Sequence, residues 1–211
     1  MSAAAMLVLH AVRVTGMADD ATVARRTGLD STEVAEQLGD AQAYGWVARF
    51  DFAGTGGWAL TEAGRDKDAA NLAAELQATG AAGAVAAAHR AFDPLNARLV
   101  RACTDWQLRP APSDRFASND HTHPEWDARV LDELAALAGE LRRLIGDLGQ
   151  ALPRFAGYDD RFRHALARAR AGQNEWVAGV GVASCHAVWM ELHEDLLSTL
   201  GIPRGVALGR G

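Results

Sequence analysis

The chain has 211 residues, 49% of them hydrophobic and 23% charged, with a formal net charge of −6. Its length suits one large domain or two modest ones, and its composition argues against intrinsic disorder. The acidic balance is not typical of a nucleic-acid binder, which usually carries a basic patch, so any DNA binding would depend on a local cluster of arginines.

Two features bear on the compartment. The apolar N-terminal stretch "MSAAAMLVLHAVRV" has no basic residue before it and is too short to span a bilayer. Cys103 and Cys185 lie in apolar helical contexts, without the spacing of a metal knuckle or a redox pair. We therefore predict two buried free thiols in a soluble cytoplasmic protein that has no membrane contact.

Three short helices are predicted before residue 45. Start and stop signals place them at about residues 2–15, from Asp19 or Asp20 to Gly28, and from Asp30 onward. Asp30 and Glu33 suggest an approximate capping box for the third helix. Its apolar residues recur at i, i+4 and i+7, which predicts a buried stripe made of Val34, Leu38 and Ala41.

A β-hairpin is predicted next. The segments "WVARFDF" and "GWALT" read as strands, and the glycines of the intervening "AGTGG" permit the positive backbone angles of a hairpin tip. Thr61 is the expected cap of the helix that follows.

The segment "VARRTGLDSTEVAEQLGDAQAYGWVARFDFAGTGGWALTEAGR" resembles the winged helix-turn-helix of MarR-type bacterial regulators. The resemblance is carried by the "ARRTGL" turn, the "GWV" exit into the first strand, and "WALTEAGR" after the hairpin. It covers about residues 5–68 and implies a winged helix-turn-helix domain at 1–68, followed by a helical dimerisation and ligand-sensing domain at 69–211.

The resemblance also implies a partner, double-stranded DNA, read by a homodimer. The third helix would enter the major groove and the hairpin would touch the flanking DNA. Hydroxyl, amide and guanidinium groups suited to base or phosphate contacts are found at Arg25, Arg26, Ser31, Thr32, Gln37, Arg49 and Arg65.

The acids of the third helix oppose that role. Glu33, Glu36 and Asp40 lie on it and no Lys or Arg does, and residues 1–70 hold six basic and ten acidic side chains. Since non-specific DNA affinity comes from phosphate neutralisation, we expect weak, salt-sensitive and dimer-dependent binding. The alternative is a winged helix that is retained as a scaffold.

The remaining residues are predicted to be entirely helical. One helix is expected to end at Gly80, and a new one to begin with Asp93 as its cap and Pro94 in its first turn. A polar loop is expected over 109–123, followed by a long helix from Pro124 to about Gln150. Two further helices are expected around 158–172 and 182–201. The long helix carries a stripe that fits a core or a dimer seam: Trp126, Val130, Leu134, Leu137, Leu141, Leu144 and Leu148.

Tryptophan, histidine and acidic residues concentrate in "CTDWQ", "NDHTHPEWD" and "SCHAVWMELHED". One interpretation is a ligand pocket with aromatic walls and polar groups. Its candidate residues are Asp105, Trp106, His121, Trp126, Trp176, His186, Trp189, Glu191 and His193.

Three other interpretations stay open for these residues. One is a metal site that joins His186 and His193 to His121, His123 or an acid, although no HExxH spacing is present. Another is general acid–base work by His186 with Glu191 or Asp105. The last is a helical core with hydrogen-bonded histidines, in which Asp120 or Thr122 caps the helix at Pro124.

No nucleophile triad, phosphate-binding glycine loop or dinucleotide fingerprint is present, so no cofactor is expected. The favoured hypothesis is a dimeric transcriptional regulator that responds to a small-molecule effector. The alternative is a repurposed winged-helix protein whose helical domain binds or transforms a small specialised metabolite, and a protein-interaction module is a third possibility.

Overall fold

The structure of the chain, a computed structural model, describes residues 2–52 and 55–203. The described chain is mainly helical, with one two-stranded antiparallel sheet. It divides into two compact units. The N-terminal unit holds the described residues up to Ala82 and those from Leu197 onward, and the helical unit is Gly83–Leu196. The boundary expected after residue 68 lies inside a continuous helix.

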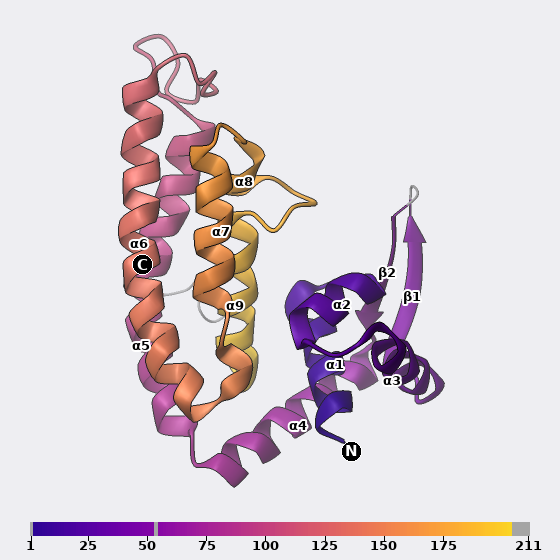
Figure 1. Cartoon of the computed structure of the whole chain (residues 1–211). Helices are drawn as coiled ribbons and strands as arrows, with labels where there is room; N and C mark the ends of the chain where they lie inside the picture. The colour runs from indigo at the N-terminus through magenta and orange to yellow at the C-terminus, as the bar shows by residue number, and fades with distance from the viewer. Residues whose placement is uncertain (1, 53–54, 204–211) are drawn as a thin grey trace. The chain divides into compact units, whose positions relative to one another are not determined.

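The N-terminal unit begins with three short helices, followed by the hairpin and a longer helix (Figure 1). In chain order these are α1 (Ala3–Thr15), α2 (Asp20–Thr27), α3 (Ser31–Ala43), β1 (Val47–Phe52), β2 (Thr55–Leu60) and α4 (Glu62–Thr79). Each of the four helices begins after a residue whose side-chain oxygen accepts a hydrogen bond from a backbone N–H of the first turn. This bond matters because the first N–H groups of a helix have no acceptor within the helix itself. The four caps are Ser2, Asp19, Asp30 and Thr61.

The hairpin pairs Val47 with Leu60 and continues in regular antiparallel register. The predicted tip begins at Ala53 and Gly54, which lie outside the described residues. The segment before α2 joins the sheet through one bridge, because Ala18 and Trp58 exchange N–H···O bonds of 3.0 and 2.7 Å. A Cβ on Gly57 would lie 2.8 Å from Met17, so glycine permits this approach.

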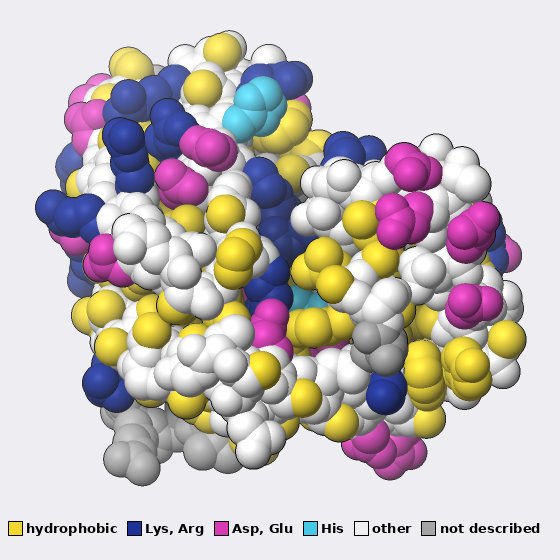
Figure 2. Space-filling model, turned by 60° about the horizontal axis from the view of Figure 1, so that its bottom comes forward, with side chains coloured by type: hydrophobic (Ala, Val, Ile, Leu, Met, Phe, Trp, Pro, Cys, Tyr) yellow, Lys and Arg dark blue, Asp and Glu magenta, His cyan; other side chains and the backbone are white. Residues whose placement is uncertain are grey.

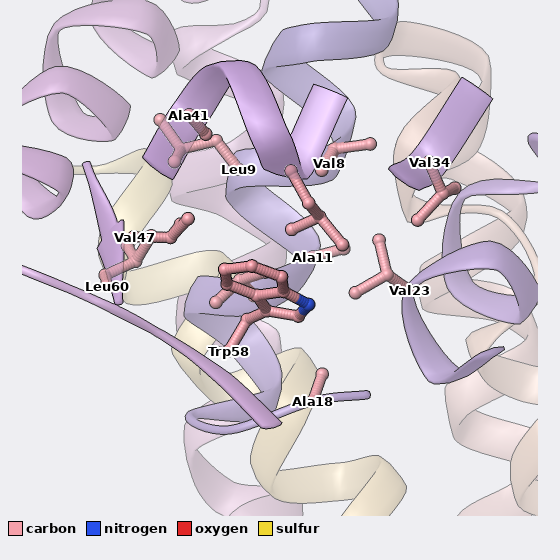
Figure 3. Packing of buried hydrophobic residues seen from close by; sticks show 12 residues of the cluster. Val8, Leu9, Ala11, Ala18, Val23, Val34, Ala41, Val47, Trp58 and Leu60 are labelled. Atoms are coloured by element: carbon pink, nitrogen blue, oxygen red, sulfur yellow. The ribbon is translucent and has the colours of Figure 1, made fainter. Parts of the chain in front are cut away.

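Trp58 lies at the centre of the N-terminal core (Figure 3). Its ring lies between the strand residues Val47 and Leu60 and the helical residues Ala11 and Val23. The indole N–H donates to the Asp20 carboxylate at 2.8 Å, so its one polar group is satisfied. The predicted stripe of α3 is buried in the same cluster.

The helical unit consists of helices of very different length, which Figure 1 shows in their order along the chain. They are α5 (Ala82–Gln107), α6 (Pro124–Ala151), the 3₁₀ turn η1 (Pro153–Phe155), α7 (Tyr158–Arg170), α8 (Glu175–Ala178) and α9 (Cys185–Thr199). Neither η1 nor α8 was predicted. Most of the predicted α6 stripe is core in the single chain, because Val130, Leu134, Leu137, Leu141 and Leu148 are buried. Trp126 and Leu144 are only half-buried.

The predicted restart at Asp93 and Pro94 is wrong, because α5 runs through both residues as one helix. Proline removes one backbone hydrogen bond from a helix interior and crowds the preceding turn. The apolar face nevertheless continues across it: Val85, Phe92 and Leu99 recur every seven residues and are all buried. Burial of that continuous face outweighs the local signal to stop.

Side-chain bonds between distant segments tie this unit together. The Trp189 ring is fully buried and stacks on Phe92 at 4.8 Å, and its N–H donates to the Asn96 side chain at 3.0 Å. The buried Asp195 carboxylate accepts from the Arg154 guanidinium and from the Tyr158 hydroxyl. Trp189 and Asp195 thus join α9 to elements far away in the sequence.

Two other expectations concern cysteine and membranes. Cys103 and Cys185 are buried free thiols, as predicted. Within residues 2–52 and 55–203, no helix combines the length and the apolar composition that a membrane crossing requires.

Candidate functional sites

The outer face of α3 differs in part from the predicted one. Because Val34, Leu38 and Ala41 are buried, the turn of 100° per residue places Thr32, Glu36 and Gly39 on the opposite side. Ser31 and Thr32 are exposed, as a DNA-reading role requires. Gln37 is only half exposed, since it lies on the flank of α3, where it lines a hollow with Ser2 and Ala5 of the α1 segment.

The predicted arginines are placed on several elements of the N-terminal unit. Arg25 is exposed on α2 and donates to the Thr22 hydroxyl at 2.8 Å. Arg49 is exposed on β1, with its guanidinium 5.5 Å from the centre of the Trp58 ring. Arg65 is exposed in the first turns of α4, and Arg26 is half-buried on α2. The exposed guanidinium groups are the phosphate-binding candidates of this unit.

The acids of α3 receive a partial structural explanation. The Asp30 carboxylate accepts from the backbone N–H groups of Thr32 and Glu33, both at 2.9 Å. No reciprocal bond from Glu33 to the Asp30 N–H is made within the described chain, so the cap is single and not a capping box. Glu36 is exposed on the outer face. In Figure 2, most charged side chains visible on the N-terminal unit, at the right of the view, are magenta acids.

The nine predicted ligand-binding residues do not surround one cavity. Asp105 and Trp126 line a hollow of about 570 Å³ between α5 and α6. Trp106 and His121 lie in a hydrogen-bonded network at the neighbouring loop. The other five lie elsewhere in the helical unit: Trp176, His186, Trp189, Glu191 and His193.

The hollow is lined by one row of side chains from each helix. The α5 row is Arg98, Arg101, Ala102 and Asp105, the α6 row is Trp126, Arg129, Val130 and Glu133, and Pro110 completes the lining. Both rows have the spacing i, i+3, i+4 and i+7, which places each on one helix face. Sequence reasoning missed the three arginines and Glu133, although this shared spacing could have revealed them.

The loop network fixes the end of this hollow. The Asn119 amide donates to the Trp106 carbonyl at 3.0 Å and to the Asp127 carboxylate at 2.8 Å. His121 has a positive φ of 58°, which is uncommon for a residue other than glycine, and its Nδ1 lies 3.0 Å from Asp127 Oδ2. The Trp106 N–H donates to the Asn174 carbonyl. These bonds hold the loop against the start of α6.

The expected cap of α6 is wrong. The residue before Pro124 is His123, which makes no side-chain cap bond. The Asp120 carboxylate instead accepts from the Thr122 hydroxyl and N–H at 2.8 and 3.1 Å. Both bonds hold the pKa of Asp120 below its ordinary value, and the bond from the Thr122 hydroxyl has the larger effect. Asp120 therefore closes a turn within the loop.

The candidates on α8 and α9 have mostly structural partners. Trp189 is core, and the Glu191 carboxylate pairs with the Arg161 guanidinium at 2.6 Å. The centre of the His193 ring lies 5.3 Å from the centre of the Phe92 ring.

Trp176 and His186 complete this group. Arg168 lies over the Trp176 ring at 4.5 Å. His186 is half-buried, and burial lowers the pKa of its imidazole. Neither side chain lines the hollow between α5 and α6.

The metal interpretation gains no support from the geometry. Among the residues that the structure describes, no three histidine, cysteine or acidic side chains come together in a way that could hold an ion. The acid–base interpretation loses one partner, because Glu191 is engaged by Arg161. The hollow between α5 and α6, in which Arg101 and Arg129 form no ion pair with a described residue, is therefore the better candidate for small-molecule binding.

Comparison of the chain with models of known protein families, with curated proteins and with solved structures gave no match.

Proposed function

We propose that the protein is a DNA-binding transcriptional regulator that acts as a dimer and responds to a small molecule. In this proposal the N-terminal unit is a winged helix-turn-helix similar to the MarR type. The observation that carries it is the combination of three short helices, a hairpin bridged by Ala18 and Trp58, and an α3 whose inner stripe is buried while Ser31 and Thr32 are exposed.

The contacts to DNA would come from the start of α3 and from the exposed arginines. Ser31 and Thr32 have hydroxyls for base edges or phosphates, and Glu36 would accept from a cytosine amino group. Arg25 and Arg49 would contact phosphates, which fix position without reading sequence. Two α3 helices of a dimer would need a separation of about 34–36 Å to enter successive major grooves.

The test is fluorescence anisotropy with a labelled fragment of the DNA upstream of the protein's own gene. The expected result is selective binding over a scrambled fragment, weakening as salt rises. The double variant Arg25→Ala/Arg26→Ala should bind far more weakly at every salt concentration and show a smaller salt slope. Arg142→Ala, an exposed arginine on α6, is the matched control and should leave binding unchanged.

A second candidate is a small-molecule binding protein with a scaffold-like winged helix. It is favoured by the exposed Glu36 and by the absence of any Lys or Arg on α3. The same assay separates the two candidates. If no DNA is bound even at low salt, the regulator proposal fails and the helical unit becomes the functional part.

A further inference from the structure

The hollow between α5 and α6 has the size and the walls of a small-molecule site. Its volume of about 570 Å³ lies in the range of ligand pockets, about 300–1,000 Å³. All its lining residues belong to the helical unit, so the site is complete within that unit. It is bounded by two helices and by the fixed loop at Pro110, and such a rigid frame favours binding because little must be ordered.

The charges in the hollow do not cancel. Arg98 Nε donates to the Glu133 carboxylate at 2.7 Å, and this bond raises the pKa of Arg98. Arg101 and Arg129 are exposed and form no ion pair in the described part of the chain. Two guanidinium groups, each with several donors in a planar fork, are thus available to an anion.

The hollow also offers a flat surface and an acceptor. The Trp126 N–H donates to the Asp105 carbonyl at 2.6 Å, which fixes the indole, and the Arg129 guanidinium lies 4.2 Å from the ring centre. Asp105 is half-buried and its carboxylate makes no bond to a described residue. A flat ring could stack on the Arg129–Trp126 pair while Asp105 accepts from a ligand N–H or O–H.

We propose that this site binds a small organic phosphate that carries a flat ring, in the class of the nucleoside monophosphates. A phosphate monoester has a charge of about −1.5 to −2 at pH 7, which matches the two unpaired guanidinium groups. Guanidinium–phosphate contacts are charge-assisted and can be bidentate. The ring would stack on the Arg129–Trp126 pair, and the ribose hydroxyls or base N–H groups would donate to Asp105.

A monocarboxylate is the weaker fit, because its two oxygens accept from fewer guanidinium N–H groups than the three terminal oxygens of a phosphate monoester do. The regulatory meaning of the site rests on the proposed function, since the ligand would then be the effector. Ligand binding itself does not require DNA. The two proposals can therefore fail separately: loss of DNA binding leaves this site intact, and an empty site leaves DNA recognition intact.

The test is isothermal titration calorimetry of the full-length protein with the 5′-monophosphates of adenosine, guanosine, cytidine and uridine. Adenosine, which lacks the phosphate, and ribose 5-phosphate, which lacks the flat ring, are titrated in parallel. At least one monophosphate should bind about tenfold or more tightly than either fragment, since both the charge-assisted bonds and the stacking contribute. Equal binding of adenosine and its monophosphate would refute the proposal.

Variants locate the site. Arg101→Met and Arg129→Met keep the long side chain and remove the charge, and each should weaken monophosphate binding by about tenfold or more. Arg142→Met, outside the hollow on the same helix as Arg129, should bind like the wild type. Thermal unfolding of each variant checks that it folds. Absence of heat with every monophosphate at millimolar concentration, or equal affinity of all three variants, overturns the proposal.

Discussion

The two units of the molecule are stabilised by interactions of different range. In the N-terminal unit each of the four helices begins at a side chain that caps its own first turn. In the helical unit α6 begins without a side-chain cap, and distant residues form the key bonds: Trp189 to Asn96, Arg154 to Asp195 and Trp106 to Asn174. Side-chain caps thus begin all four helices of the first unit, whereas the longest helix of the second, α6, begins without one.

This difference predicts how each unit responds to substitution. A cap contributes about 1 kcal/mol and acts on one helix, whereas a buried aromatic residue supports several elements and contributes more. Substitutions at Trp189, Pro94, Asp19 and His186 test this contrast.

Trp189→Ala should destabilise the helical unit most. It removes a fully buried ring that stacks on Phe92, and large-to-small core substitutions of Trp cost about 3–5 kcal/mol. Urea unfolding followed by circular dichroism measures the loss. Phe116→Ala, at an exposed aromatic residue of the loop, should change stability by less than about 0.5 kcal/mol. Similar effects of both substitutions would contradict a packed core around Trp189.

Pro94→Ala should stabilise the protein by up to about 3 kcal/mol, because it restores a helix hydrogen bond and relieves the crowding in α5. The same unfolding measurement applies. Pro112→Ala, in the loop after α5, should give no gain. If Pro94→Ala also gives no gain, the chain starts a new helix at Pro94, as the local sequence pattern indicates.

Asp19→Ala should cost about 1 kcal/mol near neutral pH, since it removes the cap of α2. The Thr22 hydroxyl and N–H hold the pKa of Asp19 below its ordinary value of 3.8. A lowered acid pKa stabilises the folded state above pH 3.8, and the contribution is lost as the pH falls through the folded value. The difference between variant and wild type should therefore shrink below about pH 3.8. Asp66→Ala, exposed on α4, is the control.

His186→Gln should have the smallest effect, visible only in the pH dependence of stability. Burial lowers the pKa of His186 from 6.5, so below that pH the unfolded chain binds the proton more readily than the folded chain. The wild type should thus lose stability as the pH falls below about 6.5, and the variant should lose less. Unfolding curves at several pH values between 5 and 8 test this. A steeper loss in the variant would contradict it.

The same contrast explains which structural features the sequence reveals. The boundaries of α1 to α4 follow from capping residues such as Asp30 and Thr61, because a cap acts within one turn and can be recognised from neighbouring letters. The restart at Pro94 was predicted wrongly for the same reason. The local signal is genuine, but the buried face through Phe92 and Leu99 overrides it, and that burial depends on partners far along the chain.

The candidate sites show the same limit. Ser31 and Thr32 are exposed as predicted, because one buried stripe determines the opposite face of a helix. Trp189 was predicted in a pocket and lies in the core, since its role depends on Phe92 and Asn96, which are nearly a hundred positions away. Arg101 and Arg129 were not predicted as site residues, because they line a common hollow only when α5 and α6 pack against each other.

The two buried thiols have a practical consequence for studying the regulator hypothesis. Burial raises the pKa of Cys103 to about 11 and that of Cys185 to about 12, so neither is ionised or reachable near pH 7. A single cysteine introduced at Thr32 would then be the one reactive site of the native chain. Spin labels attached there would report the distance between the two α3 helices of a dimer, with and without added nucleotide.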